Sequence, residues 1–172
     1  MSQLNMDNPA PWVPASGWER ALEIVTLVLV ICSWILPIMY YGELPDEVPM
    51  HFNAQGEADS WGPKSTLFIL PGITSVLYII LTAISRISPG SSYSSTLVPI
   101  TEENEAIQHR LQSEQVRITK FLTVLLLVHI TWGIVRISRE GGSHLSNWAV
   151  VLYLVAIAAT IIIYYRKAKQ HA

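Results

Sequence analysis

The loop at residues 44–64 holds the side chains of this chain that are best suited to chemistry. His51, Asn53, Glu57 and Asp59 lie close together, and a turn over Asn53 to Gly56 would bring them to one end of a hairpin. Because one imidazole with carboxylate and amide oxygens matches no zinc-binding spacing, a metal site is thinly supported. Two other interpretations stay open. One is a clasp in which the side chain of Asn53 or Asp59 accepts hydrogen bonds from turn amides, and the other is a binding surface for a ligand, peptide or partner loop.

Nucleophilic catalysis is poorly supported in this loop. His51 has no plausible serine or cysteine partner nearby, and no glycine-rich segment resembles a phosphate-binding loop. The sole cysteine, Cys32, lies inside an apolar run, where we expect it to pack rather than react. We therefore predict a non-enzymatic protein with no metal and no cofactor, and the candidate binding residues are His51, Asn53, Gly56, Asp59, Trp61 and Lys64.

The backbone of this loop is expected to form a small hairpin. Pro45 and Pro49 favour extended backbone in the residues before them. Apolar and polar residues alternate over 48–53, as in a strand, and Gly56 is free to adopt a positive φ in the turn. Residues 57–61 would return antiparallel, with the apolar side facing the bilayer and Trp61 at headgroup depth.

The rest of the chain predicts a membrane frame for this loop. Of its residues 51% are hydrophobic and only 14% are charged, and the hydrophobic residues gather in four runs at 24–41, 66–87, 121–137 and 148–165. Each run approaches the roughly 20 residues that a helix needs to cross a bilayer. The runs lack the polar stripe of soluble bundle helices. The fold class is therefore an all-α membrane protein with four transmembrane helices and a small extracytoplasmic hairpin loop between helices 1 and 2.

The organisation follows from these runs. We expect a flexible tail at 1–17, a first transmembrane pair at 18–88 with the motif loop at 42–65, a cytoplasmic linker and amphipathic helix at 89–118, and a second pair at 119–172 with a basic C-terminal tail. Thr101 is the expected N-cap of a helix that continues into the third run. Ile107, Leu111 and Ile118 share an apolar face on that helix, which could cover the bilayer, bind a partner helix or pack on its own bundle.

Two polar residues lie in or near the third run. His129 is at its centre, where an ionisable side chain is expected to face the bundle interior or a cavity. Its role is either functional or a structural hydrogen bond to another helix. Arg136 follows seven residues later and so shares roughly the same face, nearer the other membrane surface.

The distribution of basic residues predicts the orientation. With both termini in the cytoplasm, eight of the 11 Lys and Arg residues lie inside and three lie outside, as the positive-inside rule requires. The outside loop at 43–64 then holds five acidic residues and one lysine, a net charge of −4 that is unsuited to nucleic acid. We expect a multi-pass protein of the bacterial inner membrane.

The loop motif resembles that of a known family. The residues that carry it are Leu44-Pro45-Asp46, then Val48-Pro49-x-His51-Phe52-Asn53-x-x-Gly56-x-x-Asp59-x-Trp61-Gly62-x-Lys64. They resemble a bacterial membrane domain family of unknown function, which also forms the N-terminal part of the immunity protein against the sporulation-delaying-protein toxin. That immunity protein protects the producing cell's membrane and holds a repressor at the membrane. The resemblance covers the N-terminal domain alone, and further helices of the immunity protein are expected to be absent, so it implies neither immunity nor repressor binding here.

Three functions are compatible with these features. The leading one is a membrane protein whose loop binds an envelope protein or peptide, as in toxin immunity or stress resistance. A second is a small scaffold subunit that contacts partners through the helix at 102–120. A third is a metal-dependent or transport activity that uses His51, Asp59 and His129. The lipid bilayer is the one partner common to all three, and a homodimer is an additional expectation.

Overall fold

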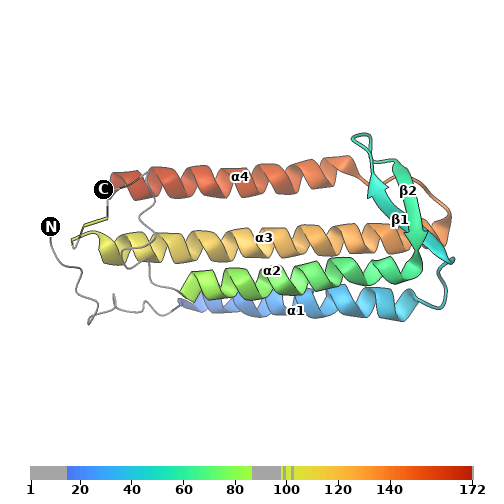
Figure 1. Cartoon of the computed structure of the whole chain (residues 1–172). Helices are drawn as coiled ribbons and strands as arrows, with labels where there is room; N and C mark the ends of the chain where they lie inside the picture. The colour runs from blue at the N-terminus through green and yellow to red at the C-terminus, as the bar shows by residue number, and fades with distance from the viewer. Residues whose placement is uncertain (1–14, 87–97, 99, 102, 172) are drawn as a thin grey trace, which may run out of the picture.

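The computed structural model describes residues 15–86, 98, 100–101 and 103–171 of the chain. Its long helices are α1 (Gly17–Tyr40), α2 (Ile69–Arg86), α3 (Glu105–Glu140) and α4 (Asn147–Gln170), and they run alongside one another (Figure 1). Four helical segments in the described residues are long and apolar enough to cross a membrane. The predicted multi-pass helical architecture is thus confirmed at this level.

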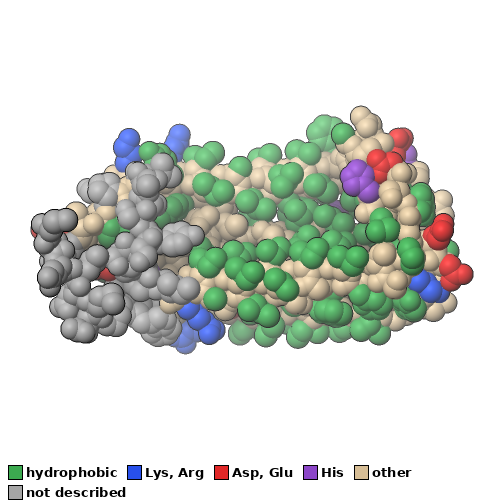
Figure 2. All heavy atoms as spheres, viewed as in Figure 1, with side chains coloured by type: hydrophobic (Ala, Val, Ile, Leu, Met, Phe, Trp, Pro, Cys, Tyr) green, Lys and Arg blue, Asp and Glu red, His purple; other side chains and the backbone are tan. Residues whose placement is uncertain are grey.

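The bundle has two different ends (Figure 1). We call the end at which α1 and α3 begin and α2 and α4 finish the terminal end. The opposite end, where residues 41–68 and 141–146 connect the helices, is the hairpin end. Most of the side chains between these ends are apolar on the visible face, while charged side chains gather toward the two ends (Figure 2).

Helix α3 is the centre of the bundle, because it packs against each of α1, α2 and α4. Helix α4 is the most peripheral: its main helical neighbour is α3, and Ala168 is its one buried residue among those described. Large apolar side chains such as Leu152 and Val155 are more than half exposed along α4. Such faces are expected where lipid tails take the place of water.

The predicted hairpin is present. Strands β1 (Glu47–Phe52) and β2 (Ala58–Pro63) pair antiparallel, from Glu47 opposite Pro63 to Phe52 opposite Ala58. Gly56 has a φ of 83° in the turn, which confirms the positive φ that the sequence predicted at this glycine. A short 3-10 helix, η1 (Lys64–Phe68), then leads into α2.

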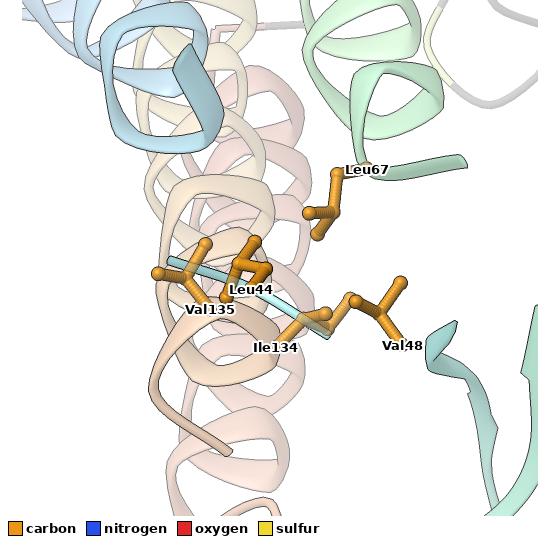
Figure 3. Close-up of a cluster of buried hydrophobic side chains, with 5 residues drawn as sticks. All are labelled: Leu44, Val48, Leu67, Ile134 and Val135. Carbon is orange, nitrogen blue, oxygen red and sulfur yellow. The ribbon is translucent and has the colours of Figure 1, made fainter. Parts of the chain in front are cut away.

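An apolar cluster fixes the hairpin end to α3 (Figure 3). Its buried members are Leu44, Val48, Leu67, Ile134 and Val135, which come from the loop before β1, from β1, from η1 and from α3. Val48 and Val135 are fully buried. On the apolar side of the hairpin, Val48 and Phe52 therefore pack on protein, whereas Met50 and Trp61 remain 49% and 47% exposed, so contact of this side with the bilayer stays a prediction.

The predicted continuous third helix is confirmed, since α3 runs unbroken for 36 residues. Its predicted N-cap is wrong: the N-cap is Asn104, because the carbonyl of Thr101 accepts the amides of Asn104 and Glu105 in a turn before the helix starts. The first turns of α3 pack on the bundle itself, and the Gln108 amide group donates to the carbonyls of Ala168 and His171 at the end of α4.

The inward face of this part of α3 is largely polar. Ile107 is 36% exposed, whereas Gln108, Ser113, Arg117 and Lys120 are buried. The polar side chains face inward because they find partners on the neighbouring helices, which are described below. The predicted tail and the linker that follows α2 lie mostly outside the described residues, which include 15–17 of the tail and 98, 100 and 101 of the linker.

Candidate functional site

The tip of the hairpin is held by its own side chains. Asn53 Oδ1 accepts hydrogen bonds from the backbone amides of Gln55 and Glu57, both at 2.9 Å. Asn53 Nδ2 donates to Glu57 Oε2 at 3.3 Å. The side-chain clasp suggested by the sequence is therefore present at Asn53, and it fixes the turn without help from a ligand.

The same turn is attached to the connection between α3 and α4. The Leu145 amide donates to the Gly56 carbonyl, and the Ala58 amide donates to the Ser143 carbonyl, both at 2.8 Å. A Cβ atom on Gly56 would lie 2.4 Å from both Asn147 Oδ1 and the Leu145 carbonyl oxygen. Gly56 is thus required twice, for its positive φ and for this close approach.

The remaining loop residues form local pairs. His51 Nδ1 lies 2.6 Å from Asp59 Oδ1 across the two strands, and both side chains are substantially exposed. Lys64 Nζ lies 3.3 Å from Asp46 and over the ring of Tyr41. Trp61 is 47% exposed on β2. The structure therefore brings His51, Asn53, Glu57 and Asp59 to the turn half of the hairpin as two adjacent pairs.

A groove of about 450 Å³ lies beneath this hairpin. Its apolar walls come from three helices, with Leu70 on α2, Ile130 and Ile134 on α3, and Val150 on α4. Its polar margin includes His51 and Asn53 of the hairpin and Asn147 at the start of α4. An apolar cavity with a few polar groups at its margin is the usual form of a binding site for an amphipathic molecule.

The charge beside the groove is mostly acidic. Glu43 pairs with Arg139 at 2.9 Å, and Asp46 pairs with Lys64. Glu57 and Asp59 lie beside histidines, His144 at 3.7 Å and His51 at 2.6 Å. Neither of these two carboxylates has a lysine or arginine as its ion-pair partner in the described structure.

A metal centre does not form from the predicted residues. Within the described ranges, no group of three or more His, Cys, Asp or Glu residues is arranged to hold a metal ion. His51 and Asp59 meet, but His129 is elsewhere, half-buried on α3 with its ring 5.8 Å from that of Tyr153 on α4. Arg136 is exposed near the hairpin end of α3. The metal interpretation that joined His51, Asp59 and His129 thus lacks its ligand set.

Sequence reasoning missed a buried ionic cluster at the terminal end. Arg117 Nη1 lies 2.5 Å from Glu19 Oε1, and Lys120 Nζ lies 2.6 Å from Glu23 Oε2. Lys120 is fully buried, and its ammonium group also donates to Thr82 Oγ1 at 2.8 Å. This ionic cluster of Glu19, Glu23, Arg117 and Lys120 joins α1 to α3 and touches α2.

The spacing of these residues held a signal that could have found the cluster. Glu19 and Glu23 are four residues apart, and Arg117 and Lys120 are three apart, so each pair shares one helix face. Two acids on the first helix and two bases on the third are complementary if those faces meet. The carboxylate of Glu19 is oriented further by the Ser16 amide and hydroxyl, at 2.6 and 2.7 Å.

Fold and site together define a multi-pass membrane protein with a hairpin-covered groove at one end of its bundle. The model of a family described as a domain of unknown function, DUF1648, matches residues 28–74. That match covers the second half of α1, the hairpin and the start of α2. It supports the resemblance of this region to a membrane domain of unknown function.

A relative shares part of the chain. An uncharacterized protein of Archaeoglobus fulgidus is 34% identical over 74 residues, which are 43% of this chain and 40% of that protein. The match therefore spans less than half the length of either protein. No solved structure matches the chain.

Proposed function

We propose that the chain is a non-enzymatic membrane protein whose hairpin groove binds an amphipathic peptide or a segment of an envelope protein. The observation that carries the proposal is the groove itself, with apolar walls from α2, α3 and α4 and polar side chains at its margin. A binding role is favoured over catalysis because the polar groups are already engaged with one another. His51 pairs with Asp59, and Asn53 is bound to the turn amides.

The charge of the site suggests the character of the occupant. Glu57 and Asp59 lie near the groove without a lysine or arginine among their ion-pair partners in the described structure. An amphipathic segment with cationic side chains would place its apolar face in the groove and its charges beside these carboxylates. The resemblance to the N-terminal part of a toxin immunity protein is compatible with such a peptide ligand.

The proposal places the hairpin end outside the cytoplasm, with both chain termini inside and the protein in the cell membrane. Eight of the 11 Lys and Arg residues belong to the terminal end. Two of them, Arg117 and Lys120, are paired with acids in the ionic cluster. The other six still exceed the three basic residues of the hairpin end, Lys64, Arg136 and Arg139. This excess supports a cytoplasmic terminal end by the positive-inside rule.

The peripheral position of α4 suggests how a second copy would associate. Its exposed apolar residues face away from α3, and close helix packing in membranes does not require a hydrophobic driving force. The homodimer is therefore proposed to use α4. Single-molecule photobleaching in liposomes at low protein density tests it, since two bleaching steps are expected and single steps would contradict the dimer.

Photocrosslinking in native membranes tests the binding role. A photoreactive amino acid at Met50, which lines the groove and is 49% exposed, should give a discrete protein or peptide adduct. The photoreactive amino acid placed instead at Met39, which is 65% exposed on α1, is the matched control and should give lipid adducts. Adding Ile130→Trp should fill the groove and remove the Met50 adduct, whereas Ile79→Trp on the exposed face of α2 should not. Lipid adducts alone at Met50, at normal expression, would contradict the proposal.

A further inference from the structure

A second cavity lies at the terminal end, between α1, α2 and α3. Its volume is about 520 Å³, and its lining includes three arginines, Arg20, Arg86 and Arg117. Arg20 comes from the first turns of α1, Arg86 from the last turn of α2, and Arg117 from the buried face of α3. Three helices that are distant in sequence thus direct cationic residues toward one space.

The carboxylates nearby leave this cavity with an excess of positive charge. Glu23 also lines the cavity, but both its oxygens accept from Lys120 Nζ, at 2.8 and 2.6 Å. Glu19 is matched by Arg117. The four residues of the ionic cluster therefore sum to zero, and Arg20 and Arg86 add a net charge of +2 at the cavity wall.

The local backbone favours an anion as well. The start of α1 adjoins the cavity at Ala15, and a helix start carries a partial positive charge. Arg20 Nε donates to the Ala15 carbonyl at 3.0 Å, which holds the guanidinium group at this position. Thr82 and Ser85 also line the wall, where the Thr82 hydroxyl accepts from Lys120 and the Ser85 hydroxyl donates to the Thr82 carbonyl.

The surroundings indicate a lipid rather than a free anion. The cavity lies where the apolar spans of α1 and α2 end, which is headgroup depth if the helices cross a bilayer. Ile24 lines the cavity and is 64% exposed, and the lipid-facing side of α1 continues from it through Val28 and Ile31. A phospholipid whose phosphate lies among the arginines could thus place its acyl chains along α1.

We propose that this cavity holds the headgroup phosphate of an anionic phospholipid. Arg20 and Arg86 would contact the phosphate from two helices, and Arg117, fixed by the ionic cluster, would form the floor of the site. Basic cavities between helices at the membrane surface are suited to such headgroups. The inference is independent of the hairpin groove, which lies at the opposite end of the bundle.

Native mass spectrometry of the full-length protein, released from nanodiscs that contain phosphatidylglycerol and phosphatidylcholine, tests this assignment. The wild type should retain phosphatidylglycerol selectively. Arg20→Gln with Arg86→Gln should lower that retention by about tenfold or more, since each basic contact to an anionic lipid contributes measurably. The control, Arg136→Gln with Arg166→Gln, removes the same charge from exposed positions elsewhere and should change retention less than about twofold. An equal loss in both double variants would overturn the site in favour of general surface attraction.

Two further measurements keep the assignment open to failure. A photoreactive phosphatidylglycerol should label the wild type at residues 15–24 or 82–86, and labelling confined to other segments would overturn the proposal. Soluble glycerol phosphate at millimolar concentration should not displace the lipid. Full displacement would show that the cavity binds free phosphate esters, and the lipid assignment would then be wrong.

Discussion

The two ends of the bundle are held together by opposite kinds of interaction. At the hairpin end, Val48 and Leu67 pack against α3 in an apolar cluster, and the turn satisfies its own hydrogen bonds. At the terminal end, the same α3 is tied to α1 by four charged residues, two of them acidic and two basic. At the hairpin end, apolar side chains are therefore available to line a groove. At the terminal end, charged residues stabilise the packing of the helices, and Arg20 and Arg86 remain outside the ionic cluster.

The largest expected effect comes from breaking the ionic cluster. Lys120→Met should lower the free energy of unfolding by about 3–5 kcal/mol, because it removes a fully buried cation and leaves the partly buried carboxylate of Glu23 without its closest partner. The measurement is reversible unfolding in mixed micelles. Lys167→Met, on the exposed part of α4, is the control and should have little effect. Adding Glu23→Gln to Lys120→Met should restore part of the loss, and a double variant no better than Lys120→Met would contradict the pairing.

The next effect is expected in the apolar cluster. Leu67→Ala should cost about 2–5 kcal/mol, because Leu67 is 2% exposed and its truncation leaves a cavity between η1 and α3. Ile73→Ala, at a side chain that is 44% exposed on α2, should cost far less. The same unfolding assay compares them, and equal losses would show that the hairpin end is not held by this cluster.

A smaller loss is expected where the hairpin meets the connection between α3 and α4. Gly56→Ala should cost about 1–3 kcal/mol, because a Cβ atom there meets Asn147 and the Leu145 carbonyl and the φ is positive. Hydrogen exchange at the Leu145 and Ala58 amides should speed up together. Gly142→Ala, whose Cβ atom would meet open space, is the control, and unchanged exchange in Gly56→Ala would contradict the attachment.

The smallest effect is expected at the exposed pair of the hairpin. His51→Ala should change the free energy of unfolding by less than about 1 kcal/mol, since the pair with Asp59 is largely open to solvent. If the groove binds a partner, however, the Met50 crosslink should weaken in this variant. A large loss of stability with an unchanged crosslink would assign His51 to structure instead of binding.

Local patterns predicted the frame and the loop well. The apolar runs became the helices, the alternation at 48–53 with Gly56 became the hairpin, and the third helix continued without a break. These features depend on residues that are neighbours in sequence, so periodicity and turn chemistry suffice to find them.

Long-range features escaped prediction because they depend on which helix faces meet. The inward direction of Arg117 and Lys120 requires Glu19 and Glu23 on a helix nearly 100 residues away. The walls of the groove likewise come from α2, α3 and α4, and no local pattern states that Leu70 and Val150 line one cavity. Apolar periodicity grouped Ile107 with Leu111 and Ile118 on one face, but it could not show that the buried face of α3 is the polar one.

We propose that the hairpin end binds a partner, whereas the terminal end serves structure and lipid contact. Photocrosslinking from Gln55, exposed at the hairpin turn, and separately from Ile107, exposed on the first turns of α3, compares the two ends in native membranes. We expect a discrete protein or peptide adduct from Gln55 and only lipid or self adducts from Ile107. A discrete partner at Ile107 with none at Gln55 would contradict this proposal and would favour the scaffold role of the helix at 102–120.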